Sequence, residues 1–158
     1  MSTLNTHTMS TTINQAVDDL EKVEKSDNIS VDMEEWVKID PFKGDFFKPT
    51  KINCSVCFAG SVMVSRYGEV ASKIDKCGPD DFDRELSATF IALDNLRGYY
   101  YRQFVETYYH CKLDDALVEY LVDELESLDL DKKQYHQSPT IFKKNMRKIA
   151  KKLKELGV

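Results

Sequence analysis

Hydrophobic side chains recur at every third or fourth position along much of the chain, and charged side chains fill the positions between them. This spacing places the apolar side chains on one face of an α-helix. Each such helix is expected to bury one face and expose the other, so the chain should fold as a bundle. The pattern predicts amphipathic helices over residues 12–24, 80–97, 99–109, 113–128 and 139–156.

One stretch departs from this pattern, because no charged side chain lies between Lys51 and Arg66. A helix that is apolar on nearly every side belongs in the interior of a domain. A strand is the competing interpretation of a short apolar run, but the length of this run and its internal glycine, Gly60, favour a helix. We therefore predict a buried central helix from Asn53 to Ser65, within an all-α, single-domain bundle of about five or six helices.

Two other segments have no helical pattern. Residues 1–12 are rich in Ser, Thr and Asn and have almost nothing to bury, so they predict a flexible leader before a single helical domain over residues 13–158. Residues 25–49 mix proline and glycine with aromatic side chains. Here we predict a short helical turn around residues 32–37, followed by irregular chain that its aromatics anchor to the core. An exposed aromatic contact surface is the alternative interpretation.

Composition narrows the class of protein. A chain of 158 residues with 42% hydrophobic content is sufficient for one modest core. No apolar run approaches the roughly 20 residues of a membrane helix, and the first residues lack the pattern of a signal peptide, so we expect a cytoplasmic protein without a membrane partner. Four cysteines in such a chain predict reduced thiols. The net charge of −5 argues against a surface that binds nucleic acid everywhere, although a local basic patch is compatible with it.

The spacing Cys54-x-x-Cys57 suggests a metal or redox site. Zinc needs about four ligands, and the remaining candidates are distant in the sequence. A redox pair would follow a strand of a βαβ unit, and residues 46–52 do not resemble one. We interpret the pair as buried structural thiols and expect neither metal nor cofactor. The other candidate ligands are Cys77, His110, Cys111 and His136.

No set of residues suggests catalysis. His110 and Cys111 are adjacent, so on a helix their side chains point about 100° apart and do not face each other. The six glycines are scattered and form no phosphate-binding loop. Pairs of carboxylates fall on outward helix faces, where solvation explains them. We therefore do not expect an enzyme.

The helix predicted over residues 113–128 is strongly acidic on its outer face. Leucines at every third or fourth position predict the face that is buried. This inner stripe consists of Leu113, Leu117, Leu121, Leu125 and Leu128, with Tyr120 beside them.

The helix predicted over residues 139–156 is the best candidate for binding. It carries seven positive side chains from Lys143 to Lys154, with no acid among them, which suits phosphates or an acidic protein. The alternative is that the acidic helix lies beside it and neutralises it. The tyrosines at 99–101, with nearby arginines, suggest stacking on a base, or the rim of a core. The candidate partner-binding residues are Lys143, Lys144, Arg147, Lys148, Lys151, Lys152, Tyr99, Tyr100 and Arg102.

The segment from Cys54 to Met63, C-S-V-C-F-A-G-S-V-M, resembles the pattern C-x-V-C-x-A-G-x-x-M of small, uncharacterised bacteriophage proteins. The resemblance implies no activity for any residue. It implies a setting, namely a small viral product in the cytoplasm of a bacterial host. Our first hypothesis is therefore a non-enzymatic phage accessory protein that binds and modulates a host protein, such as a defence factor. The alternative is a small nucleotide- or nucleic-acid-binding module that uses the basic helix and the Tyr/Arg cluster.

Overall fold

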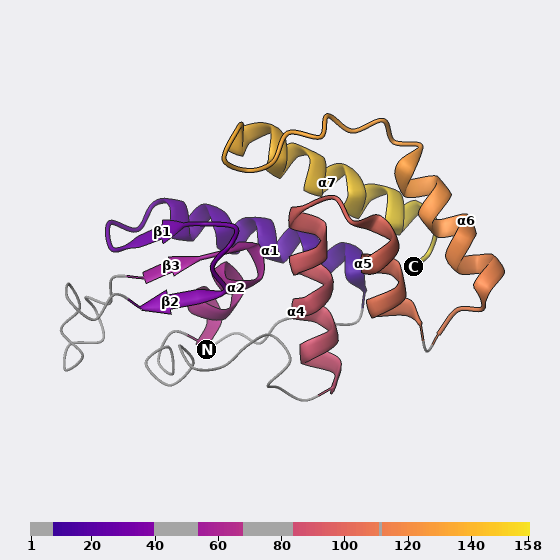
Figure 1. The fold of residues 1–158 in the computed structure, drawn as a ribbon, viewed down its shortest axis with the longest axis horizontal. Coiled ribbons are helices and arrows are strands. Elements are labelled where there is room, and N and C mark those ends of the chain that lie inside the picture. The colour runs from indigo at the N-terminus through magenta and orange to yellow at the C-terminus, as the bar shows by residue number, and fades with distance from the viewer. Residues whose placement is uncertain (1–7, 40–53, 68–83, 111) are drawn as a thin grey trace.

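The computed structural model describes residues 8–39, 54–67, 84–110 and 112–158. In this part of the chain, six helices accompany one small sheet, so the predicted helical fold class is confirmed (Figure 1). In chain order the elements are α1 (Met9–Glu24), β1 (Ile29–Val31), β2 (Val37–Ile39), β3 (Cys54–Val56), α2 (Phe58–Tyr67), α4 (Arg84–Arg97), α5 (Tyr101–Tyr109), α6 (Asp115–Glu126) and α7 (Pro139–Glu155).

Helix α1 packs against helices from both ends of the chain. Both α2 and α7 pack along it, α4 packs on α2 and α5, and α6 packs on α5. Figure 1 shows the sheet at one end of the long axis and α6 at the other. Four phenylalanines, Phe58, Phe90, Phe104 and Phe142, are fully buried and come from four different helices. The core is therefore shared by helices from both ends of the chain.

The prediction of a central helix from Asn53 to Ser65 is wrong for its first residues. Residues Cys54–Val56 form strand β3, and the helix begins only at Phe58. Strand β3 lies in the middle of the sheet, paired in parallel with β1 and antiparallel with β2. A short apolar run suits a strand with neighbours on both edges as well as it suits a buried helix, and periodicity does not separate the two.

Two further predictions need correction near the N-terminus. Helix α1 begins at Met9, so residues 9–12 of the predicted leader are helical, and residues 1–7 lie outside the described residues. The hydroxyl of Thr8 caps α1 by accepting a hydrogen bond from the Thr11 N–H at 3.2 Å, and the Met9 side chain is fully buried. The predicted helical turn at residues 32–37 is instead a turn that connects β1 with β2.

The interruption at Gly98 divides the helical pattern into α4 and α5, as two separate pieces. Tyr99 adopts a positive φ of 61° at this break. The carbonyl of Asn95 accepts the N–H groups of both Gly98 and Tyr100, which closes the end of α4. No helix in the described ranges is long and apolar enough to cross a membrane.

Candidate functional site

Helix α7 has the N-terminal signals that the sequence contains. The Ser138 hydroxyl accepts a hydrogen bond from the Ile141 N–H at 3.4 Å, and Pro139 occupies the first helical position. One face of the helix is buried against α1 and the core. This face comprises Phe142, Asn145, Met146, Ile149, Ala150 and Leu153.

Three of the predicted cations on α7 are neutralised within the molecule. Lys143 Nζ lies 2.6 Å from a Glu24 carboxylate oxygen. Arg147 pairs with α1 as well, at 2.8 Å from Asp18 and 3.7 Å from Glu21. The third, Lys152, pairs with Glu124 of α6 at 2.9 Å. Neutralisation therefore comes mainly from α1, whereas the sequence pointed to the acidic helix α6.

The remaining four lysines of α7 point away from the core. Among the described residues, no carboxylate forms an ion pair with any of them. They follow one another at spacings of four, three and three, so they lie on the outward side of the helix, with Lys154 at its edge. We call these four residues the lysine face. It consists of the exposed residues Lys144, Lys148, Lys151 and Lys154.

The tyrosine cluster is divided between the core and the surface. The Tyr99 hydroxyl donates to the Lys133 carbonyl at 2.8 Å and accepts from Asn145, while its ring lies edge-on to Phe142 at 6.5 Å. Burial raises the pKa of Tyr99 above its ordinary value. Tyr101 is buried, whereas Tyr100 is 54% exposed. Of the predicted stacking tyrosines, only Tyr100 therefore presents most of its side chain to a partner.

Arg102 is engaged with carboxylates of two helices. Its guanidinium donates to both carboxylate oxygens of Glu119, at 2.7 and 2.9 Å, and lies 3.6 Å from Glu106. The hydrogen bonds to Glu119 raise the pKa of Arg102, and in return they lower the pKa of Glu119. This bidentate pair lies at a hollow of about 420 Å³ between α5 and α6, which His110 and Asp115 also line. The pair links α6 to α5 at the surface, and it leaves Arg102 already engaged.

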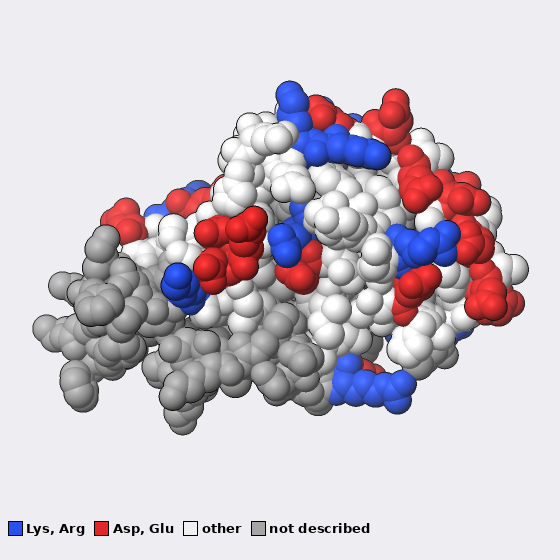
Figure 2. Space-filling model, viewed as in Figure 1, with Lys and Arg blue, Asp and Glu red and all other residues white. Residues whose placement is uncertain are grey.

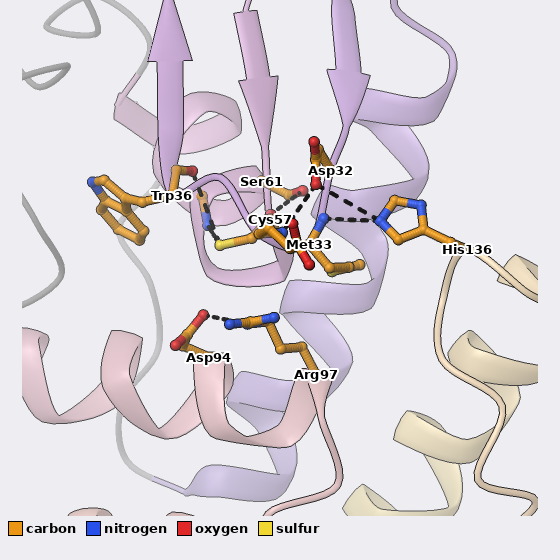
Figure 3. Close-up of polar contacts among 10 residues, drawn as sticks. Asp32, Met33, Trp36, Cys57, Ser61, Asp94, Arg97 and His136 are labelled. Carbon is orange, nitrogen blue, oxygen red and sulfur yellow. Dashed lines mark hydrogen bonds and ion pairs between the residues drawn. The ribbon is translucent and has the colours of Figure 1, made fainter.

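Cys57 has the environment of a structural thiol (Figure 3). It lies between β3 and α2, where its sulfur accepts the Gly60 N–H at 3.4 Å and its thiol points to the Trp36 carbonyl at 3.9 Å. Burial raises the pKa of Cys57 to about 11, so the thiol is protonated and unreactive at neutral pH.

Three of the six candidate metal ligands, Cys57, His110 and His136, have described side chains. Cys77 and Cys111 lie outside the described residues, as does the side chain of Cys54. Among the described residues, no group of three or more His, Cys, Asp or Glu side chains is placed to hold a metal ion. His136 instead accepts the Met33 N–H at 3.1 Å through Nε2, and lies 3.9 Å from Asp32 (Figure 3). It thereby joins the segment before α7 to the β1–β2 turn.

The structure also exposes residues that the sequence placed inside. Leu117 is 48% exposed and Tyr120 is 53% exposed, although Leu117 belongs to the predicted inner stripe. The buried side of α6 is formed by Leu121, Val122 and Leu125. The sequence contained a signal for this rotation, because Val118 and Val122 also lie at helical spacing and favour a face turned away from Leu117.

Comparisons of the chain with protein-family models, with curated proteins and with solved structures found no match.

Proposed function

We propose that this protein is a non-enzymatic binding protein that uses the lysine face of α7 to bind an acidic surface of another protein. The observation that carries the proposal is the division of charge on α7. Three cations are neutralised by α1 and α6, while the four of the lysine face have no ion-pair partner among the described residues. Like charges at this spacing repel each other, and an acidic partner relieves that repulsion.

The position of the lysine face supports a direct role in binding. The buried face of α7 is continuous with the core, and the mostly buried pair of Lys143 with Glu24 adds a contact to α1. The outward lysines are therefore carried on a rigid helix, so a partner does not have to order the backbone when it binds. Lysine side chains at the rim of an interface act mainly on the rate and specificity of association.

A protein partner is favoured over a nucleic acid by the state of the aromatic residues. Proteins that bind single-stranded nucleic acid combine cations with exposed aromatic rings on which bases stack. Tyr99 is hydrogen-bonded and packed on Phe142, and Arg102 is paired with Glu119. Only Tyr100 remains for stacking in the predicted cluster. In the bacteriophage setting that the segment 54–63 implies, we propose that the partner is a host protein whose activity is modulated.

The test compares two charge-reversed variants that have equal net charge. The first, Lys144→Glu/Lys148→Glu/Lys151→Glu, reverses the charge of three of the four residues of the lysine face. The matched control, Lys25→Glu/Lys112→Glu/Lys132→Glu, reverses three exposed lysines in other parts of the molecule. Tagged wild-type protein and both variants are expressed in bacterial cells, captured, and analysed by mass spectrometry. A protein retained by the wild type and the control, but lost from the first variant, is the expected result.

Recovery of the same proteins with all three baits contradicts the proposal, as does the absence of any specific protein. Nucleic-acid binding is measured separately, by a salt titration with labelled single-stranded and duplex oligonucleotides. Affinity that falls steeply with salt, and that the lysine-face variant loses, would favour the alternative of a nucleic-acid-binding module. We expect no such binding at physiological salt.

A further inference from the structure

The outer side of α6 presents an apolar centre to solvent. Leu117 and Tyr120 lie one turn apart on this helix and are about half exposed. Together with Tyr100 they are the large hydrophobic residues that the described part of the chain leaves exposed. Two such side chains side by side on one helix form a small apolar surface that a partner can cover.

Acidic residues extend this apolar centre in both directions. Asp114 precedes Leu117 by three residues, and Asp123 follows Tyr120 by three, so the four form a row that winds around the helix and places the two acids on opposite edges of the apolar pair. We call this set the α6 ridge; it is about 14 Å long at the rise of an α-helix. The Asp114 carboxylate also caps α6 by accepting the Leu117 N–H at 2.9 Å. Figure 2 shows the acidic side chains gathered over α6.

The α6 ridge is held in place from its other sides. The buried residues Leu121, Val122 and Leu125 anchor α6 in the core. The Arg102–Glu119 pair joins it to α5, and the Lys152–Glu124 pair joins it to α7. A helix restrained in this way needs little further ordering when a partner binds.

We propose that the α6 ridge docks a basic amphipathic helix of a partner protein, whose apolar side chains cover Leu117 and Tyr120 and whose flanking Lys or Arg side chains meet Asp114 and Asp123. This is the helix-on-helix mode of recognition, in which apolar anchors give affinity and complementary charges set the register. The ridge is distinct from the lysine face, and it requires a partner surface of the opposite charge.

Charge also argues against a second copy of this chain as the occupant. Two ridges packed on each other would bring acidic ends together, and like charges across an interface are unfavourable. The lysine face of a second copy is basic, but it contains no large apolar side chain to cover Leu117 and Tyr120. A basic helix with apolar anchors can cover Leu117 and Tyr120 and can also pair with Asp114 and Asp123.

The test uses a synthetic probe, a fluorescein-labelled 15-residue peptide of leucine and lysine with the leucines at helical spacing. Binding to the full chain is measured by fluorescence anisotropy. Leu117→Ser/Tyr120→Ser should weaken binding by at least about tenfold, since both anchors are lost. Tyr100→Ser removes the third large hydrophobic residue that is exposed in the described ranges, and it should change binding by less than about twofold. Asp123→Asn should weaken binding several-fold, and the exposed Asp27→Asn should not.

Two further peptides test the stated chemistry. A peptide of the same composition with the leucines dispersed around the helix should bind at least about tenfold more weakly, and one with glutamate in place of lysine should not bind. Circular dichroism and urea unfolding of each variant establish that it is folded. Undiminished binding by Leu117→Ser/Tyr120→Ser, equal binding of the acidic peptide, or no binding to wild type at low salt would each overturn the proposal. So would a wild-type dimer in sedimentation that the same double variant converts to a monomer.

Discussion

The backbone carbonyl of Trp36 lies directly against Gly60, in the third position of α2. A Cβ atom at Gly60 would lie 1.8 Å from the Trp36 oxygen and 2.9 Å from its carbonyl carbon. This approach brings the β1–β2 turn onto α2. The Trp36 ring also packs edge-on against Phe90 of α4, at a centroid distance of 5.2 Å. The contact explains why position 60 has no side chain: a methyl group there would displace backbone.

We therefore expect Gly60→Ala to lower the free energy of unfolding by about 3 kcal/mol, at the upper end of the usual cost of overpacking. Urea denaturation monitored by circular dichroism measures this change. The control is Gly98→Ala, whose added Cβ would meet the exposed Tyr100 ring at 2.4 Å. That ring can rotate away, so the cost should be less than about 1 kcal/mol. Equal effects of the two substitutions would contradict the role given to the Trp36 carbonyl.

The buried ion pair between α1 and α2 gives a second prediction. Asp19 is fully buried, and its carboxylate accepts hydrogen bonds from Arg66 Nε at 2.7 Å and from the Ser65 hydroxyl at 3.1 Å. Asp19→Asn removes one charge of an ion pair between two mostly buried side chains, so it should cost about 3 kcal/mol of stability. The neighbouring Asp18→Asn removes an exposed pair with Arg147 and should cost less than about 1 kcal/mol. Thermal and urea unfolding of both variants measure these costs. Similar losses of stability in the two variants would contradict the role given to the buried Asp19–Arg66 pair.

The third prediction concerns pH. Burial raises the pKa of the Cys57 thiol from 9.0 to about 11, so the unfolded chain releases this proton first as the pH rises. The contribution of the thiol to stability is complete below pH 9.0 and is lost as the pH rises toward 11. At pH 10 the loss should be about 1 kcal/mol.

The measurement is the difference in unfolding free energy between wild type and Cys57→Ser across this pH range, because other groups titrate equally in both proteins. We expect the difference to shrink above pH 9.0. Parallel pH profiles would show that Cys57 is not buried as a thiol. Slow reaction of Cys57 with a thiol reagent in native protein at neutral pH, compared with unfolded protein, is an independent check.

The fourth prediction compares buried tyrosines that differ in hydrogen bonding. The hydroxyls of Tyr101 and Tyr109 are buried and have no hydrogen-bond partner among the described residues. The hydroxyl of Tyr135 instead donates to Glu24 at 2.6 Å. Tyr101→Phe and Tyr109→Phe should therefore be neutral or stabilising by up to about 1 kcal/mol, whereas Tyr135→Phe should cost about 2 kcal/mol. Urea midpoints in the opposite order would argue against this assignment of hydrogen bonds.

The sequence by itself determined the local structure of this protein. Ser138 and Pro139 begin α7, Gly98 separates α4 from α5, and the apolar spacing gives most of the helices, because caps and periodicity act within a few residues. It also identified α7 as the helix with the basic outer surface.

Tertiary structure decided what depends on distant partners. Cys54–Val56 is a strand because β1 and β2 pair with both of its edges. Glu24 and Asp18 of α1 select which cations of α7 are neutralised, and the rotation of α6 leaves Leu117 exposed. Pairing, neutralisation and helix rotation are set by segments far apart in the sequence, so neither spacing nor composition of a single segment determines them.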